Sequence, residues 1–379
     1  MSLSLPDYRG STVDVTVLPV GNETIPTSLH FQKPVSGHDT LDLAVCSFLV
    51  ENEQAHKKVL FNLGIMKAWR EKRPERVSLP PFLSPQPLTL LNPAISVSDK
   101  AQSVNATFEA HSDVSELLTS TSVPLSSIDA VIWSNHHIDH IGDTSLFPPT
   151  TSLIVGPGFK TNPSTYPGFP RNPDSHVPHE AFDGRDVIEL DFNRPTGVLK
   201  IGGLRAIDWF DDGSMYLLEA PGRAPENLMA LARTSADKFV LLAGDTTSHP
   251  ALIRPSTLRP LPESITPSPF EPAPNSSSYD TALLARAHPA ASNESYRSTP
   301  FYEPTKYIMP DPVAGTVTRE ALQAFDASEH VFVVLDHDPS FRESGRVSLA
   351  RWEEPSGENA LNRKDAVHWR FLSDFRKGL

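Results

Sequence analysis

The sequence predicts a layered α/β or α+β domain. Short runs rich in Val, Leu, Ile and Phe recur along the chain, and most are closed by Gly, Asp, Asn or Pro, as strands usually are. Stretches of helical character lie between these runs, and that interleaving is typical of sheets covered by helices. At 379 residues the chain is long enough to bury a sizeable core, and it contains no visible internal repeat.

The elements can be placed along the chain from the same patterns. The predicted strands are residues 12–18, 43–50, 58–63, 130–133, 152–155, 198–207, 215–219, 238–243 and 331–335. Helices are predicted at residues 225–233 and 319–327.

Proline is concentrated in two stretches, at about residues 74–93 and 250–312. Proline cannot donate to a sheet ladder and it breaks helix interiors, so both stretches are expected to be loops or loose insertions. Candidate functional residues fall on both sides of the second stretch. We therefore expect one domain over residues 1–379, decorated by these insertions, rather than two linked domains.

The composition excludes several classes of function. A formal net charge of −13 and the lack of a basic block argue against a nucleic-acid partner. The first residues lack the regions of a secretory signal, and no apolar run approaches the roughly 18 residues of a membrane span. With Cys46 alone, an intrachain disulfide and CxxC-type zinc sites are excluded. We expect a cytoplasmic protein with a small-molecule substrate.

The stretch SNHHIDHIGD, residues 134–143, has the composition of a metal site. An apolar strand runs out into a loop that carries His136, His137, Asp139 and His140, and imidazole and carboxylate are the usual ligands of zinc, iron and manganese. The alternative, a polar turn with incidental histidines, rarely gathers so many ligand-type residues. This loop is the first candidate functional site.

Later strands also end in polar residues. FVLLAGDTTSH delivers Asp245 and then His249, and YLLEAPGR ends in a Pro-Gly turn with Arg223. VFVVLDHD delivers Asp336, His337 and Asp338 in the same way. Strand ends that converge on one rim can build a site from distant segments. For Asp245 alone a strand-terminating turn is an adequate explanation, and His337 alone would pass as a buried, hydrogen-bonded histidine. His249 is expected to be a pocket or surface residue.

Five motifs in this order resemble those of the metallo-β-lactamase superfamily, and in particular its lactonase-type and fungal hydrolases. They are LFNLG at residues 60–64, NHHIDH at 135–140, PGR at 221–223, GD at 244–245 and the late His337. The resemblance covers roughly residues 15–345 and implies the four-layer αββα sandwich of that superfamily. It also implies an enzyme with a metal centre.

The resemblance implies which residues would bind metal, because the family pattern HxHxDH, PGH, GD and a late His holds two ions. Its second site is complete here, with Asp139, His140, Asp245 and His337. Its first site keeps only His137 and the shared Asp245, because Asn135 and Arg223 stand at two positions where the family has histidine. Asn62 stands where the family usually has an aspartate that steadies the metal-binding loop.

Arg223 opposes a cation at the first site. Its guanidinium stays protonated and has no lone pair to donate, and Asn135 is a poor zinc ligand beside imidazole. Two unit charges 4 Å apart cost about 4 kcal/mol at an effective dielectric near 20, so a divalent ion would cost roughly twice that. We therefore expect one divalent ion, zinc before iron or manganese, with a metal-free centre as the alternative.

Three functions remain open at this stage. The first is hydrolysis of an ester, lactone or thioester in fungal-type secondary metabolism, with Asp139 and Arg223 catalytic and an anionic substrate held near Asn135, Arg223 and His136. The second is a lyase, isomerase or cyclase reaction in the same pocket. The third is an inactive binding protein in which Arg223 only pairs with Asp245 or Asp139.

Two residue roles stay undecided in all three functions. His136 occupies the family's variable position and either contacts substrate or points away. Aromatic residues in or near the proline-rich stretches either line the pocket or pack within loops; these are Trp69, Phe82, Phe270, Tyr302 and Tyr307.

Overall fold

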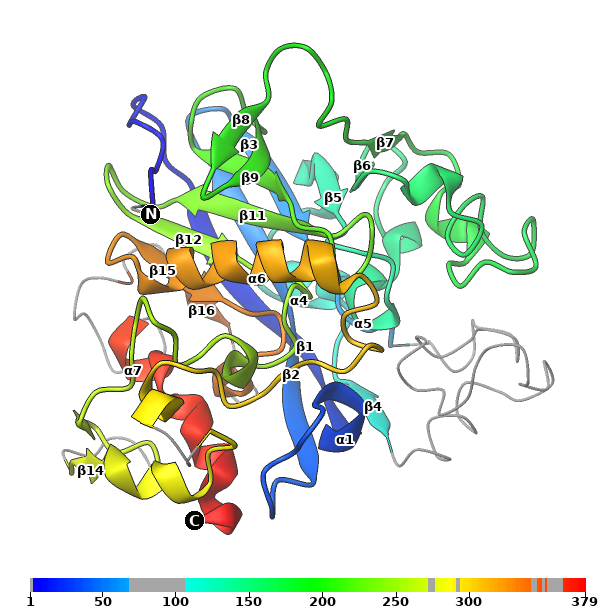
Figure 1. Cartoon of the computed structure of the whole chain (residues 1–379). Helices are drawn as coiled ribbons and strands as arrows, with labels where there is room; N and C mark the ends of the chain where they lie inside the picture. Colours follow the sequence, from blue (N-terminus) through cyan, green and yellow to red (C-terminus); the bar gives the residue numbers. More distant parts are fainter. Residues whose placement is uncertain are drawn as a thin grey trace.

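The structure, a computed structural model, describes residues 3–67, 106–271, 277–290, 294–341, 346–349, 352 and 364–379 (Figure 1). The proline-rich stretch at 74–93, with Phe82, and also Trp69 lie outside these residues. None of the described helices is both long and apolar enough to cross a membrane.

Two mixed sheets form the centre of the described chain. The first is eight-stranded, in the order β16 (Val347–Ser348), β1 (Asp14–Pro26), β2 (Thr40–Asn52), β3 (Lys57–Phe61), β5 (Ala130–Ile132), β6 (Ser152–Val155) and β7 (Val187–Glu189), with β4 (Thr107–Ala110) paired to β1. The second is six-stranded, in the order β15 (Val331–Val334), β12 (Phe239–Leu242), β11 (Leu228–Arg233), β10 (Met215–Glu219), β9 (Leu204–Asp208) and β8 (Leu199–Ile201).

The two sheets face each other across an apolar core. Alternate residues of their strands point inward, so that Phe48 and Val50 of β2 share one buried cluster with Leu217 of β10 and Val240 of β12. The other face of the first sheet packs against α4 (Val114–Ser120) and α5 (Ile138–Ile141). Together with helix α6 (Pro312–Ala327) on the outer face of the second sheet, these layers confirm the predicted αββα sandwich.

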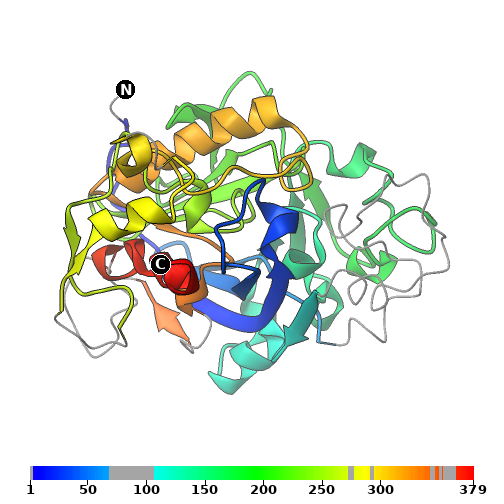
Figure 2. The ribbon, with the colours of Figure 1, turned by 60° about the horizontal axis from the view of Figure 1, so that its bottom comes forward.

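Helix α6 (Pro312–Ala327) covers the outer face of the second sheet through Ala321, Leu322 and Phe325. Asp311 caps its first turn by accepting from Val313 N and Ala314 N, and Pro312 follows at the first helical position. Figure 2 shows this orange helix outside the green strands, and the cyan helix α4 beyond the blue strands. The predicted helix at 319–327 is confirmed as its C-terminal part.

The helix predicted at 225–233 is wrong, because residues 228–233 form strand β11. Leu, Met, Ala and Arg all favour helices, but every residue of β11 is buried between β10 and β12. A short apolar run that is buried on both faces does not distinguish a strand from a helix by periodicity. The predicted strand at 198–207 is a hairpin of β8 and β9 that turns at Gly202 and Gly203.

The proline-rich stretch at 250–312 is not a loose insertion in its described parts. It forms short 3-10 helices at Pro250–Leu252, Thr281–Arg286 and Glu294–Arg297 and a small sheet of β13 (Ser264–Ile265) and β14 (Tyr279–Asp280). Its apolar residues Leu252 and Tyr302 share a buried cluster with Phe371 and Phe375 of the C-terminal segment Arg370–Gly378. Figures 1 and 2 both show the yellow and red segments side by side. Helices α1 (Thr27–His30) and α7 (Lys364–His368) complete the described α-helices. Further 3-10 helices lie at Leu125–Ser127, Thr144–Leu146, Phe159–Thr161, His179–Ala181 and Pro339–Phe341.

Helix α6 also fixes the turn that carries Arg223. Gly222 has φ +135°, and a Cβ there would lie 2.3 Å from the Cα of Gly315 in α6. Thr318 Oγ1 donates to Pro221 O at 2.7 Å, and Asp311 N donates to Gly222 O at 3.3 Å. Only glycine fits this close approach without strain.

We predict that Gly222→Ala lowers the free energy of unfolding by about 3 kcal/mol, because it adds backbone strain and a clash with α6. Denaturant unfolding measures the loss. Gly203→Ala is the control, since Gly203 has φ +88° with no atom within 4 Å of an added Cβ; it should lose only about 1 kcal/mol. Equal losses in the two variants would contradict a close contact at Gly222.

Candidate metal centre

The candidate residues come together at the carboxyl ends of strands. Strands β3 and β5 are parallel to each other, as are β12 and β15, and β10 runs in the same direction as β12 because both are antiparallel to β11. Within each sheet, the segments that leave these strands therefore emerge at one edge. Contacts such as His337 Nε2 to Asp139 Oδ2, at 3.1 Å, bring the edges of the two sheets together. The segments carry Asn62, the segment 133–140, Arg223, Asp245 and His337. Asp139 and His140, predicted on a loop, lie in the short helix α5 that ends this segment.

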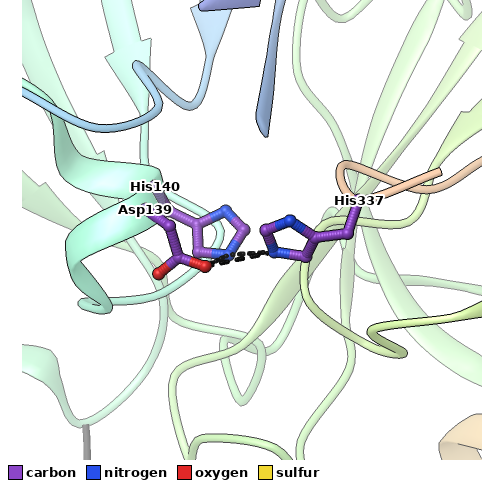
Figure 3. Close-up of side chains that lie close together, drawn as sticks. All are labelled: Asp139, His140 and His337. Atoms are coloured by element: carbon purple, nitrogen blue, oxygen red, sulfur yellow. Dashed lines mark hydrogen bonds and ion pairs between the residues drawn. The ribbon is translucent and has the colours of Figure 1, made fainter. Parts of the chain in front are cut away.

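Asp139, His140 and His337 form a group suited to a metal ion (Figure 3). All three are buried. His337 Nε2 lies 3.1 Å from Asp139 Oδ2 and 3.3 Å from His140 Nε2, and His140 Nε2 lies 3.5 Å from Asp139 Oδ2. Four ligands at about 2.05 Å in a tetrahedron are about 3.3 Å apart, so these atoms are already spaced as ligands of one ion.

The other nitrogen of each imidazole is held by the surrounding protein. His337 Nδ1 lies 3.0 Å from Ala44 O, and His140 Nδ1 lies 3.3 Å from Asp336 Oδ2. Nδ1–H groups that donate to these oxygens leave the Nε2 lone pairs facing the group. The donor set and its support therefore fit a divalent ion.

Charge also favours cation binding here. Burial would raise the pKa of Asp139, but His140 and His337 hold it well below its usual range, so the carboxyl is ionised. Burial lowers the pKa of His337, while Glu23 and Asp139 raise it more, to well above the usual value, so an ion would bind by displacing a proton from this imidazole. Asp139 Oδ1 is buried and has no hydrogen-bond partner in the described part of the chain.

The altered first site is organised around one oxygen, Asp245 Oδ2. Arg223 Nε lies 2.7 Å from it, His137 Nδ1 2.8 Å and Asn135 Nδ2 3.3 Å. All four residues are buried. Burial raises the pKa of Asp245, but Arg223, His137 and His140 together hold it well below its usual range. Burial, with Arg223, lowers the pKa of His137 to about 4, so this histidine is neutral at pH 7.

The five predicted ligands therefore divide into two groups. Asp139, His140 and His337 form the possible ligand group, whereas His137 and Asp245 are hydrogen-bonded to each other. Asp245 Oδ2 is 3.7 Å from His140 Nε2, so it adjoins the group while it pairs with Arg223.

His136 faces a different partner. Its Nδ1 is in hydrogen-bond contact with Glu226 Oε1. This contact connects the segment 133–140 to the segment that follows Arg223. Burial raises the pKa of the Glu226 carboxyl, but His136 lowers it more, below its usual range. The His136 side chain is only 11% exposed. Glu226 was missed from sequence, although it lies three residues after Arg223.

Glu23 was also missed. It is buried on β1, and its Oε1 lies 3.6 Å from His337 Nδ1. Burial raises its pKa to about 8, an effect that His337 opposes. The predicted strand ended before Pro19, but β1 continues to Pro26 with a register shift between Pro19 and Gly21. Recognising that irregularity would have placed Glu23 in a strand.

His249 is a buried structural residue and not a surface one. Its Nδ1 accepts from Ala251 N at 3.1 Å, and its Nε2 lies 2.9 Å from Asp374 Oδ2 in the C-terminal segment. The described aromatic residues are packed as well. Phe270 lies against Tyr279, and Tyr302 stacks on Phe31 with ring centroids 3.9 Å apart. Tyr307 packs against the buried cluster on the outer face of the first sheet.

Comparisons with known proteins agree with this architecture. The chain is 34% identical to Gamma-lactamase FDB1 of Fusarium pseudograminearum, over 96% of this chain and 83% of that protein. It is 34% identical to Metallo-hydrolase mfmC of Annulohypoxylon moriforme, over 100% of this chain and 91% of that protein. No family model matches the sequence.

Among solved structures, the chain is similar to a quorum-quenching N-acyl homoserine lactone hydrolase. The two superpose with a TM-score of 0.50 over 92% of this chain and 97% of that one, at 13% sequence identity. A similarity at this identity shows the shared fold alone. The chain belongs to the metallo-β-lactamase superfamily, and its curated relatives place it among the metal-dependent hydrolases of that superfamily.

We predict that Arg223→Met lowers the free energy of unfolding by about 3–5 kcal/mol, because it leaves the Asp245 carboxylate buried without its cation. Denaturant unfolding of the metal-free protein measures the loss. Arg205→Met is the matched control, since Arg205 pairs with Glu219 at 2.5 Å on the surface and should lose less than about 1 kcal/mol. An Arg223→Met variant as stable as the parent would show that Asp245 does not need this partner.

Proposed function

We propose that the protein hydrolyses a small cyclic amide or ester, a γ-lactam or lactone, using one divalent ion. The observation that carries the proposal is the mutual spacing of Asp139 Oδ2, His140 Nε2 and His337 Nε2, at 3.1–3.5 Å. Two histidines and one carboxylate are a ligand set found at catalytic zinc sites that keep an open position. The name of one relative, a gamma-lactamase, supports a cyclic substrate.

Asp139, His140 and His337 would hold the ion. A divalent ion supplies Lewis-acid polarisation of a carbonyl and lowers the pKa of a water molecule. Asp139 then has two roles, because its Oδ2 faces His337 while its buried Oδ1 is without a hydrogen-bond partner in the described residues. We assign Oδ1 to accept the proton of the attacking water and to return it to the leaving nitrogen or oxygen.

Arg223 would replace the electrostatic effect of the second ion. Its permanent charge lies 2.7 Å from Asp245 Oδ2, the oxygen that adjoins the ligand group, and it would stabilise the negative charge that develops on the carbonyl oxygen. A guanidinium also binds carboxylate bidentately, which suits an anionic substrate. Asn135 shares the Asp245 oxygen with Arg223 and would contact the same end of the substrate. A setting in secondary metabolism is part of this proposal.

A second candidate is proton transfer without hydrolysis, by a lyase, isomerase or cyclase. It is favoured by the arginine charge and the two hydrogen bonds at Asp245 Oδ2, which balance that carboxylate without a metal ion. Such a reaction would survive chelation and would give a product of the same mass as its substrate, or two fragments without added water.

The hydrolytic proposal predicts turnover on a panel of γ-lactams and lactones that is lost on chelation and restored by one equivalent of zinc. His337→Ala should fall to the background rate, while His330→Ala, which changes an exposed histidine, should retain the parent rate. Mass spectrometry that detects product without an added water would contradict hydrolysis, and parent activity in His337→Ala would exclude the assigned ion site.

Arg223 can be tested by restoring the family residue. We predict that Arg223→His binds a second equivalent of zinc, because it removes a cation and adds an imidazole beside His137 and Asp245. Arg223→Met should bind one equivalent and lose about 10²–10³-fold in kcat, the effect of removing an oxyanion donor. Titration calorimetry and kinetics measure the two effects. Unchanged kcat in Arg223→Met would exclude the catalytic role.

A further inference from the structure

The carboxylate beside His140 comes from a different part of the chain than the motif would suggest. Residue 62 of LFNLG is an asparagine and therefore uncharged. Asn62 nevertheless lies against the proposed ligand group, because its Nδ2 is 2.9 Å from His140 Nδ1. It therefore belongs beside the retained ligands and not to the altered first site. We infer that Asp336 is the positioning carboxylate of His140, and that Asn62 holds Asp336 in place.

The orientation of the Asn62 amide follows from its neighbours. Its backbone has φ 61°, a left-handed conformation that asparagine tolerates better than most residues. Oδ1 accepts from Ser134 N at 2.7 Å, so Nδ2 faces the opposite way, toward His140. The two N–H groups of the amide have two acceptor oxygens, Ser134 Oγ at 2.9 Å and Asp336 Oδ2.

In this arrangement His140 is the donor in its contact with Asp336. Asn62 Nδ2 has three neighbours for its two hydrogens, because His140 Nδ1 also lies 2.9 Å away. We assign both hydrogens to the two oxygens, so that His140 Nδ1 keeps its own hydrogen and points it to Asp336 Oδ2, at 3.3 Å. Asp336 is buried, and its main-chain oxygen accepts from Cys46 N at 3.1 Å on β2. The protein thus fixes the tautomer of His140 that presents the Nε2 lone pair to Asp139 and His337.

Positions 62 and 336 can carry only one carboxylate between them. Asn62 Nδ2 and Asp336 Oδ2 are in direct hydrogen-bond contact, and both side chains are buried. An aspartate at 62 opposite Asp336 would place two like charges at this separation, with no N–H between them. Residues 274 apart in the sequence are therefore a matched pair that supplies one charge and one amide.

The inference rests on the proposed ion site for its metal readout, and a charge-swap experiment tests it. Asp336→Asn should weaken zinc binding by about 10–100-fold in chelator competition, the usual effect of losing a carboxylate behind a histidine ligand. Asn62→Asp should weaken zinc binding and lower the denaturant midpoint of the metal-free protein. The double variant, Asn62→Asp with Asp336→Asn, should recover zinc affinity to within about threefold of the parent. Its denaturant midpoint should return to near that of the parent.

Asp338→Asn is the matched control, because Asp338 is a buried carboxylate of the same segment whose Oδ1 accepts from Ser340 N at 2.8 Å. It should bind zinc like the parent. If Asn62→Asp fails to fold, the comparison of Asp336→Asn with Asp338→Asn still tests whether the Asp336 carboxylate supports zinc binding.

Two outcomes separate this inference from the proposed function. A parent that binds zinc, with equal affinity in Asp336→Asn, would overturn the inference and leave the function standing. A parent that binds no zinc would overturn the function. Nitrogen NMR of histidine in the metal-free protein would then decide the inference: we expect a proton on His140 Nδ1 in the parent and its loss in Asp336→Asn, and an unchanged tautomer would contradict it.

Discussion

The buried ion pair of Arg223 and Asp245 determines which part of the centre can bind a metal ion. Asp245 leaves β12 at the edge where both groups of polar residues meet, and its Oδ2 receives Arg223, His137 and Asn135. A buried carboxylate needs a cation or several donors, and here a guanidinium provides the charge. Because that charge is permanent, it separates the centre into a half that is already neutralised and a half, at Asp139, His140 and His337, that can take an ion.

The scaffold explains how so many polar groups can be held in place inside the protein. Each reaches the centre from a strand end, and each is fixed by a second contact: Arg223 by the turn packed on Gly315, His136 by Glu226, and His140 by Asp336. These contacts join segments far apart in the sequence. The rigid sandwich therefore determines which residues are paired, whereas the loops determine the chemistry.

Much of the fold and the identity of the central residues could be predicted from sequence, because an apolar run that ends in His or Asp is a local signal. Strand β11 could not, since LMALAR has the composition of a helix and only its burial between two strands decides. Glu23 was missed because Pro19 suggested a strand end. The pairing of Asn62 with Asp336 depends on a contact between distant segments, which no local sequence pattern indicates. The same is true of the hydrogen bond between His249 and Asp374.

The number and position of bound ions test this description most directly. Anomalous diffraction from crystals grown with excess zinc should give one peak among Asp139, His140 and His337, with Arg223 still paired to Asp245. Two well-occupied peaks, one of them between His137 and Asp245 with Arg223 turned away, would contradict it.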